Sequence, residues 1–533
     1  MTKKMEKRAG RIGPARASIL ALCLAASLPA LLPAEAHAQA APWAESDAAI
    51  EAALRSANGS RDIRAFYKAR DYRPLWIRGG TLGPAADSLL GLIASAEADG
   101  LDPDDYRPRA LAEAIDDARG GSAKDLAKAE MLLSRSFASY VRDVRRPRES
   151  GMDFVDKELV PATPTIAAVL EEAAAAASLE SYVANSGWMH PIYGQLRKAA
   201  TAHVSARGDD DIFIPGGPGL RRGAADERVT MLRYRLGLDP RGPFDASVEQ
   251  AVRDFQAAHG LPQDGIVGSR TLAALNGGSP DSERILRVNL ERARALPARP
   301  PRRYVLVDAA AARLWLYEDG KVRDTMRVVV GKPSEPTPMM AGVIRYAMVN
   351  PYWNLPPDLA RKRVAAGVLK DGVGFLKTKG FEVLSDWSDN AVVVDPSTVD
   401  WQAAAAGRIE LRARQLPGPA NAMGKMKFMF PNDYGVYLHD TPEKDLLRKT
   451  DRRFSSGCVR VEDAPRLARW LFGKPLKVRA GDPEQRVDLS EPVPVYITYL
   501  TAAPDGDRIA FRPDVYNRDG VQLAAASRSA ARR

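Results

Sequence analysis

The sequence predicts a multidomain α+β protein: a helical region, then a small three-helix module, then a mainly β domain with a long insertion. Three observations support this. The 533 residues exceed the length of one ordinary domain. Residues 43–215 are rich in alanine and carry apolar residues at helical spacing. From Tyr304 onward, short β-rich runs separated by turns replace the helical pattern.

Residues 1–38 have the order of a secretory signal peptide. Lys and Arg residues precede an uncharged run from Ala17 to Leu32, and Ala36-His37-Ala38 forms a small-x-small cleavage site. A membrane anchor is the alternative. The run is shorter than the roughly 20 residues that span a bilayer, and Pro29 interrupts it. We therefore expect export, cleavage and no stable membrane span in the mature chain.

The composition narrows the classes of partner. Hydrophobic residues make up 45% and charged residues 27% of the chain, as in globular proteins. The first 38 residues carry six basic and two acidic residues, so their removal lowers the net charge from +10 to about +6. No Lys/Arg run is interleaved with aromatic residues, and exported proteins rarely meet nucleic acid. We expect an anionic cell-wall polymer or a membrane surface as the partner, and no nucleic acid.

The helical region is assigned to residues 39–218, and the segment 279–300 is expected to complete it. Its segment "DSLLGLIASAEADG" has helical apolar spacing, and the loop "IPGGPGL" marks its end. Nothing in this region has catalytic spacing.

The module is assigned to residues 219–278. Val248, Val252 and Phe255 fall on one helix face, Asp245 can cap that helix, and Asp264-Gly265 forms a turn. These positions, with Leu236, Phe244, Gly260-Leu261, Gly268, Thr271 and Leu275, resemble the pattern of the peptidoglycan-binding domain family. An unrelated three-helix unit is the alternative.

The β domain is assigned to residues 301–482, with an insertion at about 356–425. A loop that long inside a compact domain is usually functional or disordered, and its composition here is that of a structured segment. Residues 483–520, which contain "VPVYITYLTA", are assigned to a C-terminal strand extension, and residues 521–533 to a disordered tail.

The chemistry centres on Cys458, the only cysteine after the predicted signal peptide. It can form no internal disulfide. His439 lies 19 residues upstream at the end of a predicted strand, and a predicted helix follows Cys458 closely. An imidazole and a helix N-terminus both lower a thiol pKa, so we expect an activated Cys458–His439 pair. The alternatives are an inert buried cysteine, and Ser456 as nucleophile without the usual surrounding motif.

The residues around Cys458 fit a site for acyl transfer. Gly457 lets a substrate carbonyl approach the backbone, and the amides of Gly457 and Cys458 are candidates for an oxyanion hole. Ser455 and Ser456 are candidates to orient the imidazole or bind substrate.

Together, "VYLHDTP" and "RRFSSGCVRVEDA" resemble the L,D-transpeptidase catalytic domain, the YkuD family. That family carries a histidine, a spacer, Ser/Thr-His/Ser-Gly-Cys and a later Arg or Asn, which here are His439, Ser455, Ser456, Gly457, Cys458 and Arg460. Ser456 stands where histidine is commoner, as in the large multidomain Gram-negative subgroup typified by YcbB. "NPYWNLP", "RQLPGPANAMGKMKFMFPN" and "FYKARDYRPLWI" extend the resemblance over nearly the whole mature chain.

The resemblance implies a helical scaffold, an inserted peptidoglycan-binding module and a mainly β catalytic domain with a lid at about 356–425. It implies a cysteine-dependent, periplasmic enzyme without cofactor or metal. The enzyme would join stem peptides by 3→3 cross-links, releasing D-alanine through a thioester, and would be a carbapenem target. Its partners would be stem peptides, glycan strands and, as candidates, other cell-wall synthesis enzymes.

Tyr437, Trp353 and Arg460 are candidate substrate contacts, with a structural role as the alternative for each.

The identity of the acyl acceptor stays open. Water would make the protein an L,D-carboxypeptidase, and an outer-membrane protein amine would make it a wall-anchoring enzyme. A wall-binding scaffold with an inactive catalytic domain is a third alternative, against which the intact His439, Gly457 and Cys458 argue. The group that orients His439 is not evident, since Asp440 should point off the opposite side of the strand.

Overall fold

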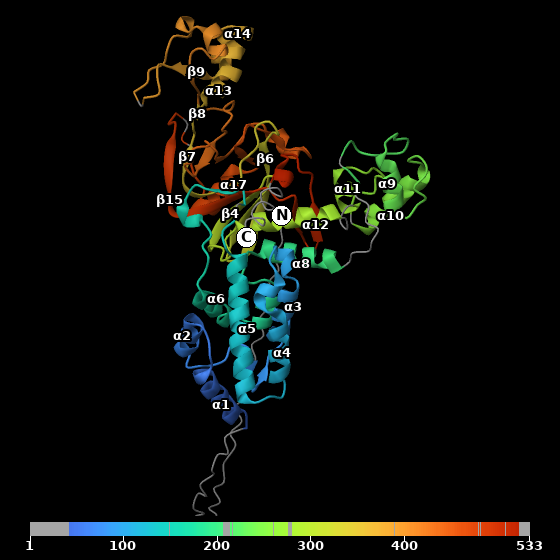
Figure 1. Cartoon of the computed structure of the whole chain (residues 1–533). Coiled ribbons are helices and arrows are strands. Elements are labelled where there is room, and N and C mark those ends of the chain that lie inside the picture. The colour runs from blue at the N-terminus through green and yellow to red at the C-terminus, as the bar shows by residue number, and fades with distance from the viewer. Residues whose placement is uncertain are drawn as a thin grey trace, which may run out of the picture.

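A computed structural model of the chain describes residues 42–521, except 149, 206–213, 216, 260, 276–279, 389, 478, 480 and 507. The predicted signal peptide and nearly all of the predicted tail lie outside these residues. Figure 1 shows the helical part below the sheet, the insertion above it, and the module at the side. This mixture of helical, modular and mainly β parts confirms the predicted fold class.

The helical part is built around α5, whose buried positions run along its whole length. A capping box between Ser122 and Asp125 starts this helix. The elements are α1 (Pro42–Ser56), α2 (Arg61–Ala69), β1 (Ile77–Arg78), β2 (Thr81–Leu82), α3 (Ala85–Ala94), η1 (Ala96–Asp99), η2 (Pro103–Tyr106), α4 (Pro108–Ala118), α5 (Ala123–Val144), β3 (Asp153–Phe154), η3 (Lys157–Leu159), α6 (Ile166–Ala174), α7 (Leu179–Ala184) and α8 (Pro191–Ser205).

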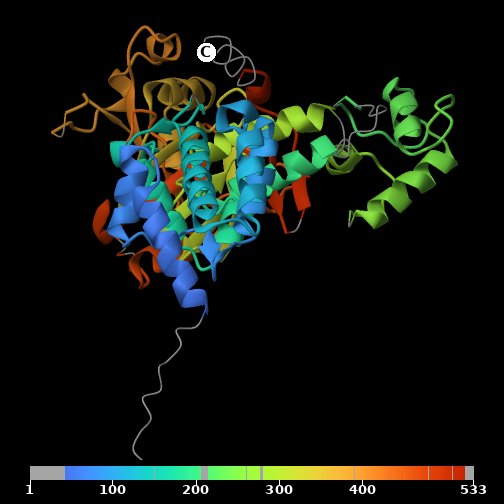
Figure 2. The same cartoon turned by 60° about the horizontal axis from the view of Figure 1, so that its bottom comes forward.

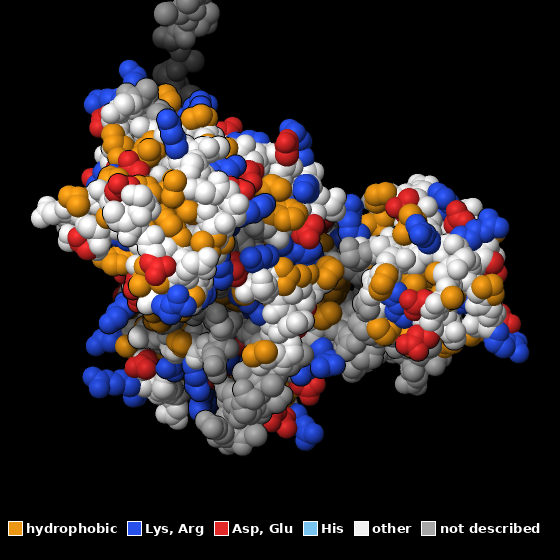
Figure 3. Space-filling model, turned by 90° about the horizontal axis from the view of Figure 1, so that it is seen from above, with side chains coloured by type: hydrophobic (Ala, Val, Ile, Leu, Met, Phe, Trp, Pro, Cys, Tyr) orange, Lys and Arg blue, Asp and Glu red, His pale blue; other side chains and the backbone are white. Residues whose placement is uncertain are grey.

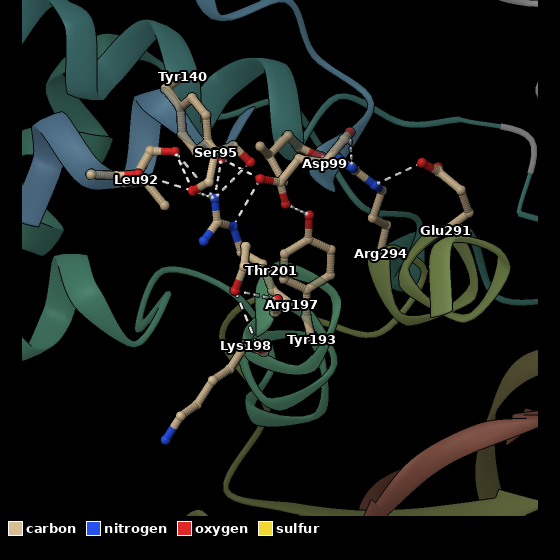
Figure 4. A network of polar contacts seen from close by, with 12 residues as sticks. Leu92, Ser95, Asp99, Tyr140, Tyr193, Arg197, Lys198, Thr201, Glu291 and Arg294 are labelled. Carbon is tan, nitrogen blue, oxygen red and sulfur yellow. Dashed lines mark hydrogen bonds and ion pairs between the residues drawn. The ribbon is translucent and has the colours of Figure 1, made fainter. Parts of the chain in front are cut away.

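A buried ionic network ties these helices together (Figure 4). The Asp99 side chain is fully buried and accepts hydrogen bonds from the hydroxyls of Tyr140 and Tyr193. Arg197 Nε donates to Asp99 Oδ2 at 2.8 Å, and Arg294 donates to the Asp99 carbonyl at 2.6 Å. Because a buried carboxylate needs its charge and lone pairs satisfied, this network fixes α5, α8 and the helix that carries Arg294 against η1.

The module contains α9 (Arg228–Arg235), α10 (Ala246–Ala258) and α11 (Ser269–Leu275). Asp245 caps α10, accepting from the amides of Ser247 and Val248. After the module comes α12 (Pro280–Arg294), which packs against α8. The module is therefore held between two helices of the helical part, and Figures 2 and 3 show it standing out to one side of the main body.

The β domain has a sheet that closes on itself. Its order is β11-β12-β14-β6-β5-β4-β15-β7-β3, and β11 also pairs with β7. The strands are β4 (Arg303–Asp308), β5 (Arg313–Glu318), β6 (Lys321–Gly331), β7 (Met340–Val349), β11 (Met426–Met429), β12 (Leu438–His439), β13 (Arg453–Ser455), β14 (Val459–Val461) and β15 (Gln485–Thr498); η6 (Lys444–Arg448) and α17 (Ala464–Phe472) complete the domain.

The structure corrects one predicted boundary. β15 lies between β4 and β7 inside the closed sheet, so residues 483–520 do not form a separate strand extension. The sequence could not show this placement, because β15 forms its backbone hydrogen bonds with β4 and β7, which lie far earlier in the chain. After it, β16 (Ala502–Asp505) and β17 (Arg508–Phe511) form a hairpin that packs against the helical core.

The insertion forms a lobe with its own apolar core. It contains β8 (Trp353–Asn354), α13 (Pro357–Leu359), the π-helix η4 (Ala360–Ala365), α14 (Ala366–Asp371), α15 (Gly374–Lys379), β9 (Phe381–Leu384), η5 (Pro396–Thr398), α16 (Trp401–Ala405) and β10 (Arg412–Gln415), with β10 between β8 and β9. Within residues 42–521, apart from the gaps given above, we find no helix that combines the length and apolarity of a membrane span.

The buried network generates a prediction about stability. Asp99→Asn leaves the Arg197 guanidinium without its counter-charge in a dry site, so we expect a loss of about 3 kcal/mol. The measurement is the midpoint of denaturant unfolding, followed by circular dichroism. Asp87→Asn is the matched control, because its ion pair with Arg119 at 2.6 Å is solvent-exposed and should contribute less than about 1 kcal/mol. Equal midpoints for the two variants would contradict a structural role for the network.

Candidate active site

The site is positioned by the parallel pairing of two short strands. In the register of β12 and β14, Leu438 lies opposite Val459 and His439 opposite Arg460, and the amide of Val459 donates to the carbonyl of Tyr437 at 3.1 Å. Tyr437 is thus the neighbour of Cys458. Because side chains alternate between the faces of a sheet, Tyr437, His439, Cys458 and Arg460 lie on one face. The structure therefore brings together four of the predicted site residues.

Cys458 is a free, partly accessible thiol. Its Sγ lies 3.4 Å from the carbonyl oxygen of Gly435. Burial raises the pKa of Cys458 to about 11, against the smaller lowering effects of Tyr437 and Arg460. The expected lowering of this pKa is wrong. The helix expected to follow Cys458 closely, α17, begins only at Ala464, after β14, so its N-terminus does not adjoin the thiol.

His439 is buried, with 1% of its surface exposed. Burial and the charge of Arg460 lower the pKa of His439 to about 3. Its Nδ1 is buried without a hydrogen-bond partner among the described residues. The Asp440 side chain points elsewhere, as expected, accepting from the Lys425 amide and pairing with Lys444 at 2.7 Å.

The loop before Cys458 is shaped by Ser455 and Gly457. Gly457 has a φ of +112°, a conformation that favours glycine, and a side chain there would meet open space. Ser455 is buried; its hydroxyl donates to the Cys458 carbonyl at 2.6 Å and accepts from the Gly457 amide at 3.3 Å. Ser455 thus holds the loop rather than facing a substrate.

This loop geometry corrects the expected oxyanion hole. The Gly457 amide is already engaged by Ser455, which leaves the Cys458 amide as the remaining donor of the predicted pair. The sequence motif could not show which amide is already used inside the loop, because that depends on the folded loop.

Thr337 contacts the loop of Cys458 and was not singled out by the sequence analysis. It is fully buried, donates to the Gly457 carbonyl at 2.8 Å and accepts from the Gly331 amide at 2.8 Å. It therefore clamps the loop of Cys458 to the segment between β6 and β7. No spacing rule links residues 120 positions apart, and the Thr-Pro step in "KPSEPTP" would have been the available signal.

The remaining predicted residues have different surroundings. Ser456 lies beside Glu335, whose pKa its hydroxyl lowers. Arg460 is largely buried and forms an ion pair with Glu443. Trp353 lies in the apolar core of the insertion, with the Arg363 guanidinium 5.4 Å from its ring centre, so the structure gives it a packing role.

The arrangement combines a neutral thiol and a neutral imidazole on one face of a sheet, beside a glycine turn with open space above it. A thiol of this kind becomes a nucleophile when a base takes its proton during attack. The geometry is therefore suited to acyl transfer through a covalent intermediate.

Comparison with known families agrees with this chemistry. Residues 302–495 match the family model described as "L,D-transpeptidase catalytic domain". Residues 61–199 match "Scaffold domain", and residues 231–275 match "Putative peptidoglycan binding domain". The chain thus carries an L,D-transpeptidase catalytic domain of the YkuD family, together with a scaffold domain and a peptidoglycan-binding domain. The predicted family and its multidomain architecture are confirmed.

Individual relatives resemble only part of this chain, at low sequence identity. A Haemophilus influenzae protein named "Putative L,D-transpeptidase" is 30% identical over 241 residues, which are 44% of this chain and 48% of that protein. The chain thus spans about half the length of this curated relative. An L,D-transpeptidase structure from Mycobacterium smegmatis is 14% identical, covering 37% of this chain and 58% of that one, with a TM-score of 0.19. One from Enterococcus faecium is 16% identical, covering 37% and 50%, with a TM-score of 0.18.

The neutral thiol generates a prediction about reactivity. Because the thiolate is the alkylated form and burial holds the Cys458 pKa near 11, alkylation by iodoacetamide should rise about tenfold per pH unit from pH 6 to pH 9.5. Mass spectrometry of the peptide containing Cys458 measures the rate, with free glutathione as the reference thiol. A plateau with a midpoint below pH 7 would instead indicate a preformed thiolate.

Proposed function

We propose that the protein is a periplasmic peptidoglycan L,D-transpeptidase that forms 3→3 cross-links between stem peptides. The observation that carries the proposal is the β12–β14 register, in which Cys458 neighbours Tyr437 and lies on the same face of the sheet as His439, within a domain of the L,D-transpeptidase family. The peptidoglycan-binding domain supports the cell wall as the partner, through stem peptides and glycan strands.

In the first half-reaction, the Cys458 sulfur attacks the carbonyl carbon of the third residue of a donor stem. The thiol proton passes to the imidazole of His439, and a carbon–sulfur bond forms. The tetrahedral intermediate then breaks its carbon–nitrogen bond, and the proton moves from His439 to the departing D-alanine. The Cys458 amide is the proposed donor to the developing oxyanion.

In the second half-reaction, the side-chain amine of a second stem's third residue attacks the thioester. The new amide forms, the carbon–sulfur bond breaks, and the thiol is restored after proton transfer through His439. The ring of Tyr437, 5.7 Å from that of His439, borders this space. No bound cofactor or metal enters any step of this proposal.

Product analysis tests the proposal. Purified disaccharide-tetrapeptide fragments are incubated with the protein, and the products are identified by mass. We expect cross-linked dimers that have lost one D-alanine, and no product with Cys458→Ala, because that change removes only the nucleophile.

Other products of the same incubation would indicate a different function. Monomeric tripeptides alone would indicate an L,D-carboxypeptidase, and attachment of an added outer-membrane protein would indicate a wall-anchoring enzyme. Binding to wall fragments without any product would indicate a non-catalytic scaffold. Turnover of Cys458→Ala within tenfold of wild type would refute the mechanism.

Carbapenems test the acyl-enzyme directly. Their strained lactam carbonyl should be attacked by Cys458, with opening of the ring carbon–nitrogen bond and one adduct per chain. Intact-protein mass spectrometry and peptide mapping measure the adduct. His439→Ala should slow its formation at least about a hundredfold, the usual contribution of a general base. An adduct on Ser455 or Ser456 would show that the nucleophile is wrongly assigned.

A further inference from the structure

An ion pair joins the lid, residues 356–425, to the rest of the catalytic domain. Lys362, in η4 of the lid, has its Nζ 3.6 Å from Glu335 Oε1, in the loop between β6 and β7. Among the described residues, no other ion pair connects the lid to the rest of the protein. Lys362 also pairs within the lid with Asp358, at 3.3 Å, and Glu335 pairs within its own loop with Lys332, at 3.2 Å.

The loop that carries Glu335 also supports the loop of Cys458. Thr337, two residues after Glu335, holds the Gly457 carbonyl, and the amide of Lys332 donates to the Ser455 carbonyl at 3.0 Å. Ser456 lies beside the Glu335 carboxylate, whose Oε2 is buried. Glu335 therefore stands between the lid and the nucleophile loop and is close to both.

A second, apolar contact joins the same two parts. Tyr437 packs against the core of the catalytic domain and also against the core of the lid. Since Tyr437 is the neighbour of Cys458, lid movement that separates this contact also changes access to the thiol. Close to where the lid rejoins the catalytic domain, Asn421 Nδ2 donates to the carbonyls of Pro351 and Leu416, which anchors the lid at its base.

We propose that Glu335 is a positioning residue: through its ion pair with Lys362 it holds the lid against the loop between β6 and β7 and so limits access to Cys458, and through Ser456 and its loop it couples the position of the lid to the nucleophile. The inference rests on the proposed role of Cys458. The pair is partly exposed, with 24% of the Glu335 and 51% of the Lys362 side chain accessible, so it shifts a lid equilibrium rather than locking it.

The experiment measures access to the thiol with iodoacetamide, an uncharged reagent, in the full chain. Wild type, Glu335→Gln, Lys362→Gln and the double variant are compared at one pH by mass spectrometry of the Cys458 peptide. We expect each single variant to be alkylated about two- to fivefold faster than wild type, the range for a partly exposed ion pair. The double variant should be no faster than either single variant, because both changes break the same pair.

The direction of the rate change in each single variant distinguishes lid opening from a direct electrostatic effect on the thiol pKa. Removing the negative charge of Glu335 alone would favour the thiolate, whereas removing the positive charge of Lys362 alone would disfavour it. An acceleration in both variants therefore indicates lid opening. Opposite changes, no change in either, or additive effects in the double variant would overturn the proposal. Raising the ionic strength from about 0.05 M to about 0.5 M should accelerate wild type and not the double variant.

Asp358→Asn is the matched control. It removes the other carboxylate partner of Lys362, inside the lid, and should leave the rate at the wild-type value. An acceleration equal to that of Glu335→Gln would overturn the proposal, because the bridge to the catalytic domain would then be irrelevant. Circular dichroism verifies folding of each variant. Alkylation needs only an accessible thiol, so this result stays distinct from the product analysis that tests the proposed function.

Discussion

The parallel pairing of β12 with β14 is the constraint on which the site depends. β12 is only two residues long, yet its pairing with β14 decides that Cys458 adjoins Tyr437 and that His439 lies opposite Arg460. A slip by one residue would turn one pair of side chains to the other face of the sheet. The register is held from both sides: β14 pairs with β6, and β12 pairs with β11, which closes the sheet onto β7.

The electrostatics of the site follow from burial. A thiol and an imidazole withdrawn from water each keep their neutral form, so the pKa of Cys458 rises and that of His439 falls. Arg460 acts on both groups: its charge favours the thiolate and disfavours the imidazolium. The proton on sulfur must therefore leave during attack, and an anionic substrate group near Arg460 would ease its acceptance by His439.

Residues near the C-terminus contact the segment between β6 and β7, far earlier in the chain. The Arg518 guanidinium donates to the Thr337 carbonyl at 2.9 Å, and Tyr516 contacts the carbonyl of Gly331 at the end of β6. Arg292 of α12 pairs with Asp519 at 2.7 Å. The C-terminal segment thus braces the segment between β6 and β7, which Thr337 joins to the loop of Cys458, and it also braces α12, the helix that follows the peptidoglycan-binding domain.

The sequence by itself determined the α+β class, the three parts, and the motif containing Cys458 and His439, because helical periodicity, turn residues and short motifs are local properties. The tertiary structure alone decided the rest. It placed β15 inside the sheet, engaged the Gly457 amide with Ser455, packed Trp353 into the apolar core of the insertion, and joined Thr337 to the loop of Cys458. The expected lowering of the Cys458 pKa differs from the structure for the same reason, since a thiol pKa depends on the surroundings that non-local packing creates, and no local pattern encodes them.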